Sequence, residues 1–338
     1  MLVFLFLSFP NEKVLYSMTC FNPLQAWRVP GLTKNGKQQL TFNRGEASSV
    51  TCLKTSEVTL PCGQCSGCRL ERSRQWAMRC MHESSLWSSN CFITLTYDND
   101  NLPSDGSLDK SHAQKFMKRF RKRFSGIDSY TDSTGKVSNP IRYYYCGEYG
   151  DKYGRPHYHF IIFNFDFDDK LFFKRLNDSV LYTSDKLASL WPYGYSSVGS
   201  VTFESAGYVA RYCMKKITGD ASKEHYKRVD PDTGEVFDIL PEYNDMSRRP
   251  GIARDWYEQF ISDVYPKDFV TVRGKKMQPP RYYDKLYEVD NPDAFKAIKE
   301  KREKLNSLNK DNNSYERLKV RERCFQKNIT DKLPRNLI

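Results

Sequence analysis

His157 and His159 stand one residue apart at the start of an apolar run, residues 157–163, that predicts a β-strand. Successive side chains of a strand point to opposite faces of a sheet, so these two imidazoles are predicted to share one face. Two imidazoles on one face are a pair of potential ligands for a divalent metal ion. The alternative is that both are ordinary polar residues on a half-buried sheet face.

A carboxylate is predicted beside this pair. Residues 141–146 also predict a strand, and the glycine-rich segment that follows them predicts a tight turn. If the hairpin is symmetric about residues 152–153, Glu148 lies directly opposite His157. The three side chains then form a metal site with open positions for a substrate. A shift of one residue in the turn would point Glu148 to the other face.

Two tyrosines form the second group with chemical potential. Tyr208 and Tyr212 are four residues apart in a predicted helix and therefore share one face, with Lys215 or Lys216 about one turn further on. A phenol is a poor nucleophile at neutral pH unless a nearby cation helps its ionisation. The alternative is that the tyrosines pack in the core and the lysines are solvated.

A third group consists of cysteines. Cys62, Cys65 and Cys68 could present three thiolates to one Zn²⁺, with glycines between them allowing the turn. Three residues are candidates for a fourth ligand: Cys80, His82 and Cys52. The alternative is that reduced cysteines cap and pack the helix predicted to follow. The irregular spacing of the 10 cysteines argues against a disulfide scaffold.

Basic residues are the candidates for contacts with phosphates. Apolar residues recur at intervals of three and four from 108 to 124, which predicts an amphipathic helix whose other face is basic. The residues that we consider for DNA contact are Lys118, Arg119 and Lys122 on this helix, and Arg248 and Arg249 further along. A solvated surface is the alternative for both groups.

The remaining pattern predicts the elements that must position these groups. Residues 91–97 predict a strand, with Thr94 and Thr96 on one face, where they could lie beneath the metal site. Residues 168–190 have a helical pattern, and residues 291–327 predict charged helices with one interruption.

The tyrosine helix is predicted to span about residues 204–216. Ser205 is its expected N-cap, and Gly219 is expected just after its end.

Composition limits the class of protein. The chain of 338 residues has a formal charge of +12, which favours a polyanionic partner such as nucleic acid. The apolar start lacks a positive n-region and is too short to span a membrane, so we expect a soluble, cytosolic protein with no membrane partner. The chain has no internal repeats.

The order of the motifs resembles a known family. An apolar-Thr-Leu-Thr strand, then Gly-Glu with Arg-Pro-His-Tyr-His-Phe, then Tyr-Val-Ala-Arg-Tyr-Cys-Met-Lys-Lys is similar to the three motifs of HUH-type rolling-circle replication initiators. The Pro-Cys-Gly-x-Cys-x-x-Cys and Met-Ser-Arg-Arg-Pro-Gly segments resemble more narrowly the initiators of gokushovirus-type microviruses, which are single-stranded-DNA phages. The resemblance covers about residues 19–290.

The resemblance implies an α+β HUH endonuclease fold with a central antiparallel sheet flanked by helices. It implies Mg²⁺ or Mn²⁺ on His157, His159 and Glu148, and a nucleophile pair supported by a lysine. The implied activity is site-specific nicking of the phage origin in the host bacterial cytoplasm, with a host helicase and polymerase as partners. Two other functions remain open. One is a non-catalytic, zinc-stabilised nucleic-acid-binding protein, and the other is an HUH transposase.

We divide the chain into four parts. Residues 1–18 are expected to be a non-essential extension, with Met18 as an alternative start. Residues 19–90 form a cysteine-containing segment, residues 91–290 the nicking domain, and residues 291–338 a charged helical appendage.

Overall fold

The computed structural model describes residues 20–332, apart from residue 35 and residues 46–56, 132–134, 151–152, 177–178, 217–220 and 230–232. The chain divides into two compact units. The first contains residues 72–298, and the second contains the described parts of residues 15–71 and 299–334. Among the described residues, no helix combines the length and apolarity needed to cross a bilayer.

A seven-stranded sheet forms the centre of the first unit, with the strand order β14-β7-β8-β4-β11-β10-β9. Its strands are β4 (Asn90–Tyr97), β7 (Arg142–Tyr149), β8 (Pro156–Phe163), β9 (Leu171–Leu176), β10 (Ser179–Thr183), β11 (Gly194–Ser200) and β14 (Tyr243–Met246). Every neighbouring pair is antiparallel. The predicted α+β class and central antiparallel sheet are therefore confirmed.

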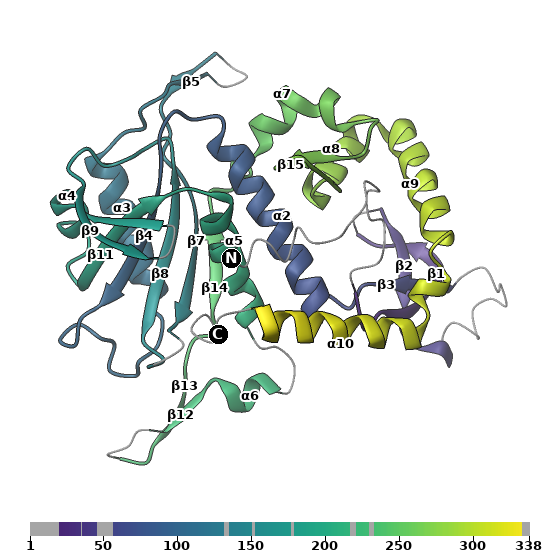
Figure 1. Ribbon diagram of the computed structural model, residues 1–338, viewed down its shortest axis with the longest axis horizontal. Coiled ribbons are helices and arrows are strands. Elements are labelled where there is room, and N and C mark those ends of the chain that lie inside the picture. The colour runs from purple at the N-terminus through teal and green to yellow at the C-terminus, as the bar shows by residue number, and fades with distance from the viewer. Residues whose placement is uncertain are drawn as a thin grey trace. The chain divides into compact units, whose positions relative to one another are not determined.

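Helices cover both faces of this sheet (Figure 1). One face packs against α3 (Lys110–Arg123) and α4 (Asp185–Ala188), and the opposite face packs against α2 (Ser66–Ser84) and α5 (Phe203–Lys215). In β8, Tyr158, Phe160 and Ile162 belong to the first core, and Ile161 and Phe163 belong to the second. The strict alternation places the histidines of β8 on the face covered by α2 and α5.

The amphipathic helix predicted at residues 108–124 is α3, and its apolar positions are buried as the spacing predicted. Its N-cap is Asp109, whose carboxylate accepts a hydrogen bond from the Ser111 N–H. This helix covers the face of the sheet that does not carry the histidines.

The helix predicted over residues 168–190 is wrong. This segment forms β9 and β10, and only the short α4 is helical. Strand β10 pairs with β11 through Tyr182 and Val198, and β9 extends the sheet from β10. The aromatic and β-branched residues of both segments suit a pleated sheet, and pairing with the sheet edge overrides the local helical spacing.

The tyrosine helix α5 begins earlier than predicted. Its N-cap is Thr202 instead of Ser205. The Thr202 hydroxyl accepts from the Ser205 N–H at 3.1 Å, and the Ser205 hydroxyl accepts from the Thr202 N–H at 2.8 Å. This reciprocal capping box satisfies two backbone donors and fixes where the helix starts. Gly219 lies outside the described residues.

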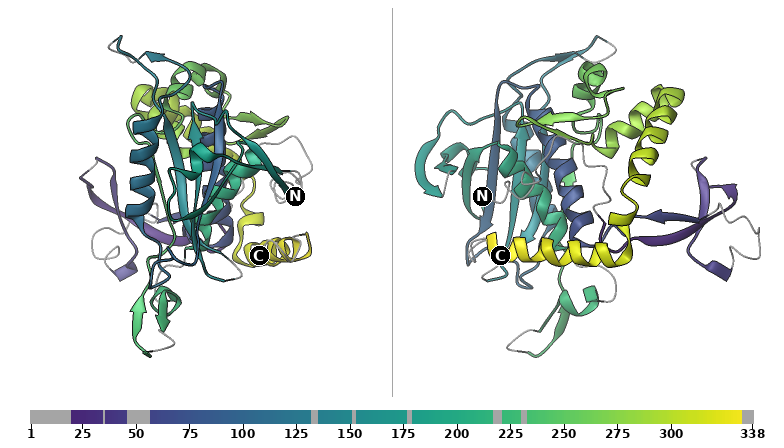
Figure 2. Two further views of the ribbon diagram at one scale, coloured as in Figure 1. Left: turned by 90° about the vertical axis from the view of Figure 1, so that its left-hand side faces the viewer. Right: turned by 45° about the vertical axis from the view of Figure 1, so that its right-hand side comes forward.

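The second unit contains a three-stranded sheet of order β2-β1-β3, formed by β1 (Leu24–Leu32), β2 (Gln38–Thr41) and β3 (Glu57–Leu60). Its C-terminal helix is α10 (Tyr315–Lys332), which Figure 2 shows from two sides. The rings of Phe21 and Phe325 lie 5.4 Å apart, so the residues just before β1 contact this helix.

The other elements are short, or lie toward the C-terminus. They are β5 (Tyr130–Thr131), β6 (Val137–Ser138), α6 (Ala221–His225), β12 (Lys227–Val229), β13 (Val236–Asp238), α7 (Arg254–Val264), β15 (Val270–Val272), β16 (Lys275–Met277), α8 (Arg281–Asp290), α9 (Pro292–Ser307) and the 3₁₀ helix η3 (Asp311–Asn313). The predicted C-terminal helices and the break between them are confirmed.

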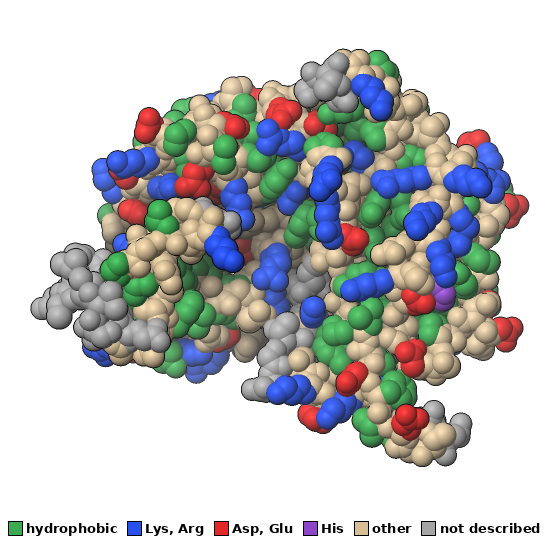
Figure 3. Space-filling view, turned by 180° about the vertical axis from the view of Figure 1, so that it is seen from behind, with side chains coloured by type: hydrophobic (Ala, Val, Ile, Leu, Met, Phe, Trp, Pro, Cys, Tyr) green, Lys and Arg blue, Asp and Glu red, His purple; other side chains and the backbone are tan. Residues whose placement is uncertain are grey.

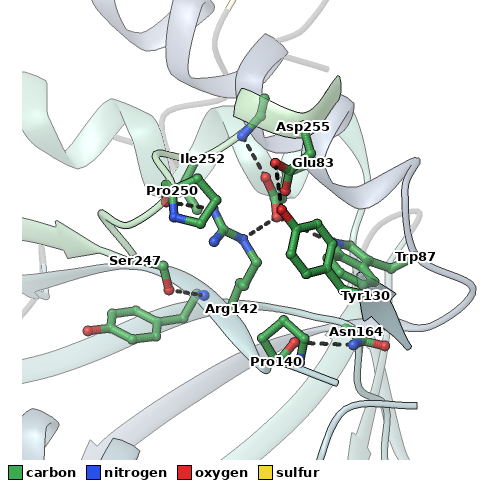
Figure 4. A network of polar contacts seen from close by, with 12 residues as sticks. Glu83, Trp87, Tyr130, Pro140, Arg142, Asn164, Ser247, Pro250, Ile252 and Asp255 are labelled. Carbon is green, nitrogen blue, oxygen red and sulfur yellow. Dashed lines mark hydrogen bonds and ion pairs between the residues drawn. The ribbon is translucent and has the colours of Figure 1, made fainter. Parts of the chain in front are cut away.

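A buried ion pair joins α2 to the sheet (Figure 4). The Glu83 carboxylate is fully buried and pairs with the Nε of Arg142 on β7. It also accepts from the Ala253 N–H and, at 3.3 Å, from the Trp87 Nε1–H. Arg142 donates to the Pro250 carbonyl oxygen at 2.9 Å. One carboxylate therefore ties α2, β7 and the segment before α7 together.

We expect Glu83→Gln to lower the free energy of unfolding by about 3–5 kcal/mol, because it leaves the Arg142 guanidinium buried without its counter-charge. Urea unfolding followed by tryptophan fluorescence measures this. The control is Glu258→Gln, which removes a surface ion pair with Arg254 and should cost less than about 1 kcal/mol. Equal effects of the two substitutions would contradict a structural role for the buried pair.

Candidate active site

Strands β7 and β8 bring Glu148, His157 and His159 together. Glu148 pairs directly with His157 in the β7–β8 register, so the predicted pairing is confirmed. The Nε2 atoms of His157 and His159 lie 2.6 Å and 2.9 Å from the same carboxylate oxygen, Oε1 of Glu148. Glu148 is 1 % exposed, and the three ligand atoms all lie within 4.8 Å of one another. This Glu/His triad can bind a metal ion.

The far nitrogen of each imidazole is held by the protein. Nδ1 of His157 lies 3.1 Å from the Arg155 carbonyl oxygen, and Nδ1 of His159 lies 3.0 Å from the Thr94 hydroxyl. A carbonyl oxygen only accepts, so Nδ1 of His157 carries a proton and its Nε2 is turned toward Glu148. Such contacts fix the ring orientation of metal-binding histidines.

The charge of Glu148 requires a positive partner. Burial raises the pKa of this carboxyl, but its contacts with His157 and His159 outweigh burial and hold the pKa below its ordinary value. A buried carboxylate between two imidazoles is stabilised either by a protonated ring or by a cation that all three groups bind. An octahedral ion with bonds of about 2.1 Å has neighbouring ligand atoms about 3 Å apart. The observed separations of 2.6 Å and 2.9 Å are close to that value.

We expect Thr94→Val to weaken Mn²⁺ binding by about 10–100-fold, because it removes the hydroxyl that orients His159. Isothermal titration calorimetry with Mn²⁺ measures the change. Thr96→Val is a matched control, since Thr96 lies on the same strand and pairs with His157. No hydrogen bond from the Thr96 hydroxyl to either histidine is found among the described residues. If both variants bound Mn²⁺ like the unmodified chain, Thr94 would have no orienting role.

Helix α5 brings a tyrosine to the triad. It packs against β7 and β8, and the half-buried ring of Tyr208 meets His159 edge-on with 5.1 Å between ring centroids. Tyr212 lies one turn further along α5, but its side chain and that of Lys215 are outside the described part of the chain. Lys216 is exposed and follows the last residue of the helix.

The basic residues predicted to contact DNA are not gathered at the triad. Helix α3 lies on the opposite face of the sheet, with Lys118 and Lys122 exposed there. Arg119 donates to the Leu190 carbonyl oxygen at 3.0 Å, which gives it a structural role. Arg248 is exposed and pairs with Asp245 at 2.8 Å, and Arg249 is exposed beside it. DNA contact by these residues stays a prediction.

The second candidate metal site is the four-cysteine cluster, Cys20, Cys62, Cys65 and Cys68, whose sulfur atoms all lie within 4.8 Å of one another. Cys20 is the fourth member, and Cys80 does not belong to the cluster.

The residues considered as the fourth ligand lie elsewhere. Cys80 is buried in the apolar core with Ala77 and Met78. His82 stacks on Trp256, with 3.5 Å between ring centroids. Cys52 is outside the described residues. Sequence spacing did not indicate Cys20, which is 42 residues from Cys62 and reaches it only through pairing of β1 with β3.

Fold and site together define an α+β protein whose sheet carries a buried Glu/His triad beside a tyrosine-bearing helix. A family model for replication-associated proteins of the ORF2 type matches residues 90–217. The matched segment begins with β4 and ends just after α5, so it contains both the triad and the two tyrosines.

Similar proteins occur in three phages. The chain is 32 % identical over 282 residues to the replication-associated protein VP4 of Bdellovibrio phage phiMH2K, covering 82 % of this chain and 80 % of that protein. It is 32 % identical over 306 residues to the replication-associated protein ORF2 of Spiroplasma virus 4, covering 85 % and 87 %. It is 32 % identical over 285 residues to the replication-associated protein ORF4 of Chlamydia phage 1, covering 81 % and 64 %.

The chain belongs to this family of phage replication-associated proteins. No solved structure matches it.

Proposed function

We propose that this protein is an HUH-type replication initiator that nicks the phage origin in single-stranded DNA. The observation that carries the proposal is the contact of Tyr208 with His159, since it puts a potential nucleophile beside a potential metal site. Family membership supports a role in phage DNA replication. A covalent strand transfer explains why both groups occur on one face of the sheet.

The reaction that we propose is a transesterification. The phenol oxygen of a tyrosine bonds to the phosphorus of the scissile phosphodiester, and the bond from phosphorus to the 3′ oxygen breaks. The phenol proton is transferred, through solvent, to the leaving oxygen. The products are a 5′-phosphotyrosyl link and a free 3′-OH that can prime synthesis.

The triad would hold Mg²⁺ or Mn²⁺, which would polarise the phosphate and orient the displacement. The chain's own contribution is to fix the ligands: Thr94 and the Arg155 carbonyl hold the outer nitrogens of the two imidazoles. Lys215 or Lys216 is proposed to favour the ionised phenol as a nearby cation.

Two tyrosines suit a replication cycle. We propose that one of the pair, Tyr208 and Tyr212, keeps the 5′ end while the other cleaves the regenerated origin, after which the displaced strand is rejoined. Each step exchanges one phosphodiester for another, so no nucleotide cofactor is required. The sequence has no complete P-loop motif. Unwinding and synthesis would therefore use a helicase and a polymerase of the host bacterium, in whose cytoplasm the protein would act.

The charge of the chain supports a DNA partner. Its formal charge is +12, and basic side chains are spread over the face shown in Figure 3, with fewer acidic ones among them. Positive charge on the surface attracts the phosphate backbone without regard to sequence, so origin specificity must come from other contacts.

We expect Tyr208→Phe and Tyr212→Phe each to impair the full cycle, and the double variant to lose nicking by at least about 1000-fold, because no phenol remains to attack the phosphate. The measurement is cleavage of a single-stranded origin oligonucleotide, with the covalent protein–DNA adduct resolved by denaturing electrophoresis. The control is Tyr315→Phe, which alters an exposed tyrosine at the start of α10. Full nicking by the double variant would exclude the mechanism.

The adduct also separates the competing functions. A non-catalytic nucleic-acid-binding protein would form no adduct, and an HUH transposase would form one on transposon ends instead of the phage origin.

We expect the double variant His157→Ala, His159→Ala to abolish Mg²⁺- or Mn²⁺-dependent cleavage, because it removes two of the three ligands. Initial rates over a range of Mn²⁺ concentrations measure this loss. His225→Ala is the control, since His225 is an exposed histidine at the end of α6. Undiminished cleavage by the double variant would remove the metal from the mechanism.

A further inference from the structure

The four-cysteine cluster lies outside the segment that the family model matches and has no part in the proposed nicking reaction. Strand pairing assembles it. Leu24 of β1 pairs with Leu60 of β3 in an antiparallel register. Cys20 lies shortly before the first of these residues and Cys62 shortly after the second, so the two cysteines meet at the same end of the sheet.

The other two cysteines lie at the start of α2. Cys65 directly precedes the helix, and its carbonyl oxygen accepts a hydrogen bond from the Arg69 N–H at 3.0 Å. Cys68 is in the first turn, and its sulfur lies 4.0 Å from that of Cys62. A strand end, a glycine-containing turn and a helix start therefore converge on one point.

The sulfur–sulfur distances fit a tetrahedral ion. Four sulfurs bound to zinc at about 2.3 Å form a tetrahedron whose edges are about 3.8 Å long. The observed separations are 3.6 Å for Cys20 and Cys62, 3.9 Å for Cys20 and Cys65, and 4.0 Å for Cys62 and Cys68. A disulfide needs sulfurs only about 2.05 Å apart and would use two of the four cysteines. All four are free thiols here.

Backbone N–H groups point at the sulfurs. The N–H of Cys62 lies 3.2 Å from the sulfur of Cys20, and the N–H of Phe21 lies 3.3 Å from that of Cys65. The N–H groups of Gln64 and Cys65 lie 3.4 Å and 3.3 Å from the sulfur of Cys62. Such donors stabilise negative charge on sulfur, which is the form that binds a metal.

We propose that Cys20, Cys62, Cys65 and Cys68 hold one structural Zn²⁺. With four protein ligands and no open position, the site is closed and has no catalytic role. It would join the segment before β1 to the end of β3 and the start of α2. That segment also contacts α10, since Asn22 accepts from the Lys319 ammonium at 2.6 Å. The ion would thus organise the second unit, independently of nicking.

The test starts with the intact chain, expressed in zinc-containing medium and purified under reducing conditions without chelators. Inductively coupled plasma mass spectrometry should find about one zinc per chain, and X-ray absorption at the zinc edge should fit four sulfur neighbours at about 2.3 Å. Absence of bound zinc, a shell containing nitrogen or oxygen ligands, or a Cys20–Cys62 disulfide in place of the ion would overturn the proposal.

Variants assign the ligands. Cys20→Ala should lose most of the zinc, whereas Cys80→Ala, a buried cysteine outside the cluster, should keep it. The double variant His157→Ala, His159→Ala should also keep it, which separates this site from the triad. Retention by Cys20→Ala together with loss by Cys80→Ala would reverse the assignment. If Cys20→Ala did not fold, the absorption spectrum of the unmodified chain would still decide between the outcomes.

Discussion

The register of three strands, β7, β8 and β4, is the constraint on which the site depends. Because side chains alternate with a period of two, a slip of one residue would send both histidines of β8 into the opposite core. Apolar burial alone does not prevent this slip, since β8 is apolar on both faces beyond His159. The polar residues set the register: Glu148 is buried and would lose both imidazoles, and burying an unpaired carboxylate is very unfavourable. On the other face, the Tyr158 hydroxyl contacts Tyr97 at 3.0 Å and accepts from the Asp109 N–H at 2.9 Å.

Helix α2 connects this register to the position of the nucleophile. Glu83 near its end pairs with Arg142, which lies on the same face of β7 as Glu148. Earlier in the helix, the Ser73 hydroxyl donates at 3.3 Å to the carbonyl oxygen of Gly207, the residue before Tyr208. The side chains of α2 thus hold both the strand that carries the carboxylate and the helix that carries the tyrosine. A change in α2 is therefore transmitted to the geometry between Tyr208 and His159.

The sequence was sufficient for features encoded by short-range patterns. The β7–β8 hairpin and the place of Glu148 followed from a turn and an alternation, and α5 followed from its helical spacing. What failed depends on distant partners. Cys20 enters the cysteine cluster only because β1 pairs with β3, and Tyr182 lies in a strand only because Val198 is beside it. The N-cap was misassigned because Thr202 and Ser205 cap each other, and either hydroxyl alone is a reasonable cap.

The proposed function gives a reason for placing the metal ligands on strands and the nucleophiles on a helix. Adjacent strands fix Glu148, His157 and His159 through ladder hydrogen bonds, which suits an ion that must keep its position through repeated transfers. Two tyrosines four residues apart share one face of a helix but are offset by about 6 Å along its axis. They therefore cannot occupy one position at the same phosphate. One phenol can keep a covalent strand end while the other meets a new phosphate, and a single fixed metal site can serve both.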